Sequence, residues 1–229
     1  MSDVDPVACA DAYRALRERV SVIVRQADPA ALDAVAPATP EWRVRDVLAH
    51  MVGVNTDILT GTLDGVASDA WTAAQVATRH DWPIEQMLEE WVQSASAVEA
   101  NAPILGPAVG QWVYDACTHE HDVRQALGAP GARGSDAVVI GFEWATDRLG
   151  DLLDGPGAPG FVLHTEAGTK NIGTTEPRTG VHTSRFEIVR AMTGRRSAAQ
   201  IEAYGWDGPA RPEHLVLGIF TLRADDFVE

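Results

Sequence analysis

The sequence contains little cysteine and no long apolar run. Its two cysteines, Cys9 and Cys117, have neither a C-x-x-C spacing nor the number that a disulfide framework needs. This scarcity favours a reducing compartment and two buried, unreactive thiols. No stretch approaches the roughly 18 consecutive apolar residues of a membrane-spanning helix, and residues 1–6 lack the basic, then apolar, pattern of a signal peptide. These absences predict a cytoplasmic protein.

Basic residues are also scarce. The chain has 18 Lys and Arg against 33 Asp and Glu, which gives a formal net charge of −15. The phosphate backbone of a nucleic acid and the anionic face of a membrane would both repel such a protein. We therefore expect no nucleic-acid partner and no membrane partner. The 229 residues, 45% of them hydrophobic, suffice for a substantial core, and we expect a monomer or a homodimer.

Apolar residues recur at every third or fourth position in five stretches of the chain. This spacing places them on one face of an α-helix, so each stretch is predicted to be an amphipathic helix that packs against a core. The predicted helices span residues 6–27, 42–59, 84–100, 111–128 and 136–153. Two of the intervening segments, 61–81 and 101–110, are polar or broken by glycine and proline, which is typical of loops.

The pattern changes after a run rich in glycine and proline at residues 154–160. Residues 161–165 and 172–175 are predicted to form two short strands that pair as a hairpin, with a turn at 168–171 between them. Two short helices are predicted at residues 183–192 and 198–204. The sequence therefore predicts a mainly α, α+β fold, with a helical bundle over residues 1–154 and a small α+β domain over residues 155–229.

One predicted helix, residues 111–128, concentrates ionisable side chains. At about 100° per residue, Asp115, His119 and Asp122 fall within roughly 40–60° of one another. Cys117 and His121 fall about 200° and 240° from Asp115 on the same count. One face of this helix therefore carries a carboxylate and an imidazole one turn apart, and the other two side chains are poorer candidates for the same site.

A second histidine, His50, lies inside the predicted helix 42–59. Because a bundle brings facing side chains together, His50, Asp115 and His119 would supply two imidazoles and one carboxylate to a divalent metal, with a coordination position left open. Asp46, one turn before His50, is predicted to hold the second ring nitrogen of His50. The alternative is that these histidines are hydrogen-bonded core residues. Four other histidines are predicted to lie on the surface: His80, His164, His182 and His214.

Three motifs together resemble the maleylpyruvate isomerase family of mycothiol-dependent enzymes, over nearly the whole chain. They are TPEWRVRDVLAH at residues 39–50, DACTHEHDVRQALG at residues 115–128 and GRRSAAQ at residues 194–200. The resemblance implies an N-terminal DinB-like four-helix bundle and a C-terminal α/β domain with a sterol-carrier-like fold. It also implies a divalent metal, usually zinc, that activates the thiol of mycothiol.

Residue by residue, the resemblance implies that His50, Asp115 and His119 are the metal ligands. The family has Glu where this chain has Asp115, so a shorter carboxylate must reach the metal, and affinity or metal choice is expected to differ. Arg195 and Arg196 are candidates for binding the cofactor, or alternatively form a charge cluster at a helix end. The implied partners are a small-molecule thiol and an electrophilic substrate, and the implied activity is isomerisation.

Two other functions remain open at this point. A mycothiol S-transferase acting in detoxification would use the same residues on a different electrophile. A non-catalytic binding or regulatory protein on the same scaffold would need no metal. Asp57, Glu120 and Asp122 are candidates for a general acid or base, although a structural role is favoured for Asp122.

Overall fold

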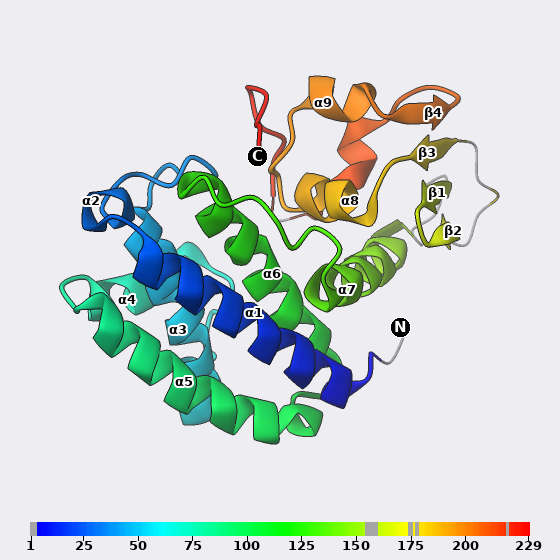
Figure 1. Cartoon of the computed structure of the whole chain (residues 1–229). Coiled ribbons are helices and arrows are strands. Elements are labelled where there is room, and N and C mark those ends of the chain that lie inside the picture. Colours follow the sequence, from blue (N-terminus) through cyan, green and yellow to red (C-terminus); the bar gives the residue numbers. More distant parts are fainter. Residues whose placement is uncertain (1–3, 154–159, 174–175, 177–178, 219) are drawn as a thin grey trace. The chain divides into compact units, whose positions relative to one another are not determined.

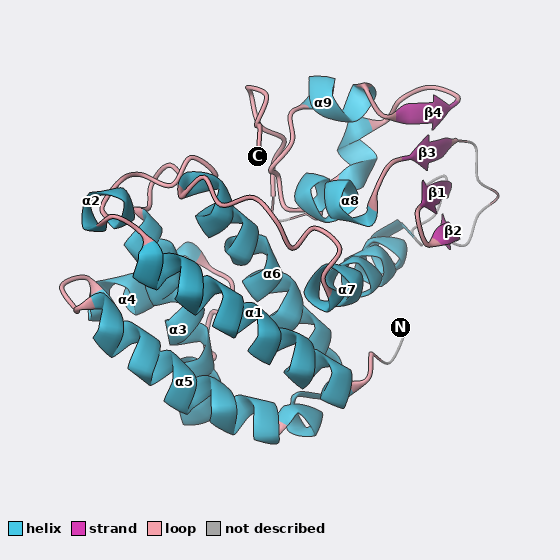
Figure 2. Ribbon diagram, viewed as in Figure 1, coloured by secondary structure: helices cyan, strands magenta, loops and turns pink. Residues whose placement is uncertain are grey.

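The computed structural model describes residues 4–153, 160–173, 176, 179–218 and 220–229. Over these ranges the protein is mainly α-helical with a small four-stranded sheet (Figures 1 and 2). The predicted α+β, mainly α fold class is therefore confirmed. The chain forms two compact units, one of residues 5–131 and the other chiefly of residues 132–229, and each is described separately. Among the described segments, no helix combines the length and the apolar character needed to cross a membrane.

The first unit is a four-helix bundle. Helices α1 (Pro6–Gln26) and α3 (Val44–Thr60) each pack against both α5 (Ile84–Ala100) and α6 (Val109–Ala126) (Figure 1). The four helices predicted for this region are confirmed, and their apolar faces form the core. Because α3 and α6 are neighbours, side chains on their facing sides meet inside the bundle. The shorter α2 (Pro29–Leu32) and the 3-10 helix η1 (Ala102–Ala108) lie in its connections.

A buried polar network joins the four helices at their centre. The hydroxyl of Tyr13 accepts hydrogen bonds from Asn55 at 2.6 Å and from the indole of Trp91 at 3.0 Å. The indole of Trp112 donates to the side-chain oxygen of Asn55 at 3.1 Å and stacks on Tyr13 with ring centroids 3.8 Å apart. Burying these polar groups is tolerable only because they satisfy one another, so the network favours one register of the four helices.

The segment 61–81, predicted as a loop, contains a further helix, α4 (Asp69–Arg79), which packs on α3. The side chain of Ser68 caps its first turn by accepting from the amide of Trp71. The residues that α4 buries, Gln75 and Arg79, are polar, so apolar residues do not mark the face that packs on α3. A Cβ at Gly53 of α3 would lie 2.6 Å from the Cβ of Gln75, and the absence of that atom allows the two helices to approach closely.

The second unit is built around a sheet with strand order β2-β1-β3-β4. Strands β1 (Phe161–Thr165) and β2 (Gly168–Ile172) form a hairpin, but its second strand is not the predicted one. Residues 168–171, predicted as the turn, belong to β2, which ends at Ile172, where the second strand was predicted to begin. Residues 174–175 of that predicted strand lie outside the described residues. Strand β3 (Gly180–His182) pairs with β1 in parallel and with β4 (Gly205–Asp207) antiparallel. Helix α7 (Asp136–Leu153) packs on β2 and on α8 (Arg185–Met192). The short helices α9 (Ala198–Glu202) and η2 (Pro212–Leu215) complete the unit.

The position of α7 bears on the predicted domain boundary at residue 154. Contacts within the chain divide it into two units before α7, at residue 132. The change of sequence periodicity instead comes after α7. The prediction relied on the run of glycine and proline at residues 154–160. All of this run except Gly160 lies outside the described residues. The boundary at residue 154 therefore stays a prediction.

Candidate metal centre

Three predicted ligands come together in the bundle. His50 extends from α3, and Asp115 and His119 extend from α6, with their potential ligand atoms all within 4.8 Å of one another. The Nε2 atoms of His50 and His119 lie 3.6 and 3.8 Å from the same carboxylate oxygen of Asp115. Ligands about 2.0–2.1 Å from a tetrahedral zinc ion are separated by roughly 3.3 Å. The three side chains are thus close to the spacing that one ion requires.

The far side of each imidazole has a hydrogen-bond partner. His50 Nδ1 lies 2.7 Å from Oε1 of Gln75, and His119 Nδ1 lies 3.0 Å from Oδ2 of Asp122. The amide nitrogen of Gln75 donates to Asp57 at 2.6 Å, so the amide oxygen is the atom that faces His50. Both partners accept, which places a proton on each Nδ1 and presents the lone pair of each Nε2 to the other ligands.

The partner of His50 differs from the one that the sequence predicted. Asp46, the predicted partner of His50, instead accepts from the amide of Arg43 at 3.0 Å and from its guanidinium at 2.8 Å, which closes the first turn of α3. The partner of His50 is Gln75, from the helix that apolar periodicity missed. Asp122 has the structural role that the sequence favoured, and its partner is the metal-ligand candidate His119.

We expect Gln75→Leu to weaken zinc binding by about 10- to 100-fold, because His50 would lose the acceptor that orients its ring. Asp46→Ala is the matched control: it is expected to lower the free energy of unfolding by about 1 kcal/mol through loss of the helix cap, with zinc affinity unchanged. Competition with a chelating dye measures the affinity, and chemical denaturation measures the stability. Equal zinc affinities of wild type and Gln75→Leu would show that Gln75 does not support the site.

Aromatic rings surround the two histidines. The ring of Trp42, just before α3, lies 5.2 Å from that of His50 and 6.1 Å from that of His119, measured between centroids. Trp71, from α4, lies 6.3 Å from His50 at nearly a right angle. His50 and His119 are buried, at 2% and 8% exposure, whereas the side chain of Asp115 is 35% exposed. Solvent therefore reaches the site on the side of the carboxylate.

The environment shifts the pKa values of the two imidazoles in opposite directions. Burial lowers the pKa of His119, despite the nearby carboxylates of Asp122 and Asp115. Burial also acts to lower the pKa of His50, but the charge of Asp115 and the hydrogen bonds to Asp115 and Gln75 outweigh it and raise that pKa above its usual value. A histidine binds a metal only through an Nε2 that carries no proton. Because the pKa of His50 is the raised one, a proton would compete with a metal mainly at His50.

The other predicted candidates have mainly structural contacts. Glu120 is fully buried and pairs with Arg19 at 2.8 and 2.7 Å and with Arg124 at 3.0 Å, so its carboxylate is occupied by two guanidinium groups. Cys117 and His121 are buried, at 0% and 3% exposure, and neither belongs to the cluster of potential ligand atoms.

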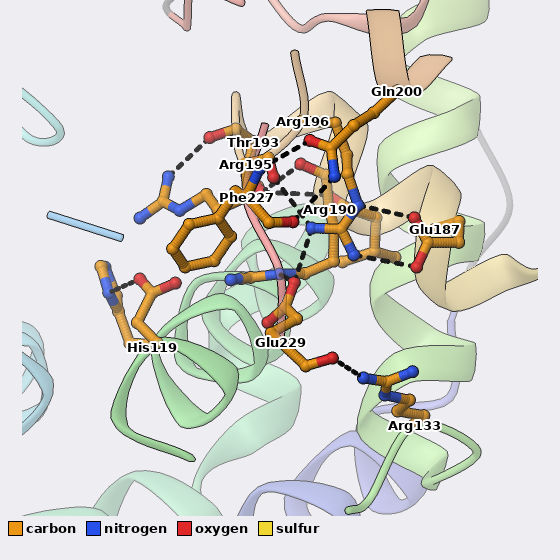
Figure 3. A network of polar contacts seen from close by, with 12 residues as sticks. His119, Arg133, Glu187, Arg190, Thr193, Arg195, Arg196, Gln200, Phe227 and Glu229 are labelled. Atoms are coloured by element: carbon orange, nitrogen blue, oxygen red, sulfur yellow. Dashed lines mark hydrogen bonds and ion pairs between the residues drawn. The ribbon is translucent and has the colours of Figure 1, made fainter. Parts of the chain in front are cut away.

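Arg195 and Arg196 lie in the second unit, between α8 and α9. Arg196 donates to both oxygens of Glu187 at 2.6 and 2.8 Å and to Glu229 at 2.7 Å (Figure 3). Arg195 donates to the backbone oxygen of Thr193 at 2.6 Å, and both arginines are buried. These contacts agree with the charge-cluster alternative for Arg196, and a role of either residue in cofactor binding stays a prediction.

The fold and the cluster define a class of protein: a helical bundle that presents two imidazoles and one carboxylate at a shared point, joined to a small α+β unit. The family model described as the mycothiol maleylpyruvate isomerase N-terminal domain matches residues 13–152. The chain belongs to this family. No curated protein sequence matches the chain.

Solved structures with this fold are also known. Two structures of a mycothiol-dependent maleylpyruvate isomerase, one of them a histidine-to-alanine mutant, each match with a TM-score of 0.61. The matches cover 93% of this chain and 99% of theirs, at 14% and 15% sequence identity. At this level of identity the likeness shows that the fold is shared over nearly the full length.

Proposed function

We propose that this protein is a metal- and thiol-dependent enzyme that uses mycothiol to add to, and isomerise, a small electrophilic substrate. The observation that carries the proposal is the convergence of His50, Asp115 and His119 within 4.8 Å. Membership of the mycothiol maleylpyruvate isomerase family supports both the thiol and the reaction class.

The residues present fit a divalent ion of the zinc type. Both histidines direct Nε2 toward Asp115, and both hold a proton on Nδ1 through an acceptor, as metal-bound histidines do. Two nitrogens and one oxygen suit zinc better than they suit magnesium or calcium. A bound divalent ion would lower the pKa of a coordinated thiol, which would then react as a thiolate at neutral pH.

The chain's own residues support this chemistry in three ways. Gln75 and Asp122 fix the orientation of the two imidazoles. The rings of Trp42 and Trp71 flank His50 with apolar surface, which strengthens electrostatic interactions at the site by lowering the local dielectric. The carboxylate of Asp115 is partly exposed, so a thiol and a substrate would approach the site from its side.

Thiol consumption distinguishes an isomerase from an S-transferase. Addition of a thiolate to a conjugated double bond leaves a single bond that can rotate, and elimination then regenerates both the double bond and the thiol. An S-transferase instead forms a lasting carbon–sulfur bond. We expect zinc-loaded protein with mycothiol to convert maleylpyruvate without loss of free thiol. One thiol lost per product would indicate the transferase. A protein that binds no metal and shows no thiol-dependent turnover would be the non-catalytic alternative.

The pH dependence of zinc binding is a further prediction. Because the pKa of His50 is raised in the metal-free protein, its ring takes up a proton at a pH above the usual value of about 6.5. As the pH is lowered, zinc affinity should therefore begin to fall while the pH is still above 6.5. For one competing proton, the fall is about tenfold for each pH unit below the pKa of His50. His119, whose pKa is lowered, should compete only at lower pH. Calorimetric titration between pH 8 and pH 6 checks this, and a constant affinity over that range would contradict it.

A further inference from the structure

A second cluster of histidines and a carboxylate lies in the unit of residues 132–229. His164 of β1 and His182 of β3 are direct partners in the parallel register of these strands, and Asp207 comes from β4 on the other side of β3. Their potential ligand atoms all lie within 4.8 Å of one another. No spacing in the sequence connects the two histidines, and both were therefore predicted to be surface residues.

The geometry resembles that of the cluster in the bundle. The Nε2 atoms of His182 and His164 lie 2.8 and 3.7 Å from the same oxygen, Oδ2 of Asp207. The two imidazoles stack, with centroids 4.2 Å apart and planes 12° from parallel. The far nitrogen of His164, Nδ1, lies 3.2 Å from the hydroxyl of Thr169 on β2. Both Nε2 atoms thus lie near one carboxylate oxygen, and that of His182 is within hydrogen-bond distance of it.

A glycine leaves the space at this point open. A Cβ at Gly180 would lie 3.0 Å from Oδ2 of Asp207 and 3.1 Å from Nε2 of His164. Any other residue would therefore place a carbon atom against two of the three potential ligand atoms. At Gly205, likewise, a Cβ would lie 3.2 Å from the Cβ of His182. The two glycines give the stacked rings and the carboxylate room to share one site.

We propose that His164, His182 and Asp207 form a second divalent-metal site, on the sheet. Two imidazole nitrogens and one carboxylate oxygen favour zinc, copper(II) or nickel(II) over magnesium and calcium. The side chains are 32%, 49% and 65% exposed, so water fills the remaining coordination positions and the ion exchanges readily. The site is independent of the proposed chemistry of the bundle.

The alternative is a plain hydrogen-bonded pair of His182 and Asp207, with His164 stacked beside it. A pair of this kind would bind no metal in the micromolar range. The two possibilities differ in the number of zinc ions that the full-length protein binds, and in which variants lose an ion.

The test is a zinc titration of full-length protein from which metal has been stripped with a chelator. His119→Ala removes a ligand of the bundle cluster, so we expect this variant to bind one zinc ion, at the sheet. Adding His182→Ala is expected to abolish that binding, and adding His80→Ala, which removes an exposed histidine outside both clusters, is expected to preserve it. If the His119→Ala variant binds no zinc, or if His182→Ala leaves its zinc binding intact, the proposed site does not exist.

Gly180→Ala provides a second variant that keeps all three ligands. In the His119→Ala background it should weaken zinc binding by at least about tenfold, because the added carbon displaces Asp207 or His164 from the shared point. Circular dichroism confirms that each variant is folded. If, in the His119→Ala background, neither Gly180→Ala nor His182→Ala weakened zinc binding, the bound zinc would belong to other residues. If only the site in the bundle did not bind zinc, the result would be different: the wild-type protein would bind one zinc ion, and His182→Ala would abolish that binding.

Discussion

His50→Ala and His119→Ala are each expected to weaken zinc binding by the bundle more than 100-fold and to abolish thiol-dependent turnover with it. Each variant would remove one of the three proposed ligands, so the loss should exceed the 10- to 100-fold effect that is typical of residues that merely orient a ligand. The titration is best made in the His182→Ala background, so that the cluster on the sheet does not contribute. Zinc affinity and turnover with mycothiol are the two measurements.

Cys117→Ala is the matched control for this experiment. Cys117 belongs to the same helix as His119 and is fully buried, but it is not a member of the ligand cluster. Zinc binding and turnover should both remain near the wild-type values. If Cys117→Ala abolished turnover while His50→Ala and His119→Ala did not, the reacting thiol would belong to the protein, and the proposed mechanism would be wrong.

Glu120→Ala is expected to have the largest effect on stability, a loss of roughly 3 kcal/mol in the free energy of unfolding. The carboxylate of Glu120 is fully buried between Arg19 and Arg124. Its removal leaves the charge of Arg124, whose side chain is only 11% exposed, without this partner, and breaking a buried ion pair typically costs about 3–5 kcal/mol. The lower end of this range applies because the side chain of Arg19 is 30% exposed and water partly solvates it.

Chemical denaturation measures this loss, and zinc affinity provides the control measurement. Glu120 lies on α6 beside His119, yet its contacts run to α1 and to the end of α6. A folded Glu120→Ala protein should therefore retain its zinc affinity. Wild-type stability combined with loss of turnover would instead identify Glu120 as the general acid or base that the sequence left open.

The long helices and the pairing of Asp115 with His119 were predictable because local pattern determines them. The apolar residues of α1, α3, α5 and α6 follow the helical period. The spacing of Asp115 and His119, one turn apart on one face, follows from the same geometry. His50 could be added because a bundle brings facing helices together and because the surrounding motif resembles a known family.

The supporting residues were not predictable in the same way. Gln75 lies on α4, a helix whose buried residues are polar, so a search for a buried apolar face does not reveal it. Asp46 had the right spacing to reach His50, but the free amide and the guanidinium of Arg43 compete for its carboxylate at the start of α3. Sequence spacing cannot decide such a competition, because it depends on which donor lies closer in three dimensions.

By itself, the sequence determined the helical bundle, the mainly α, α+β class and the pairing of Asp115 with His119 on one helical face, since each depends on periods of a few residues. Only the tertiary structure decided which side chain supports His50, and only it joined His164, His182 and Asp207 across three strands. Residues far apart in the chain meet through strand register and helix packing. These long-range contacts leave no spacing in the sequence that would reveal them.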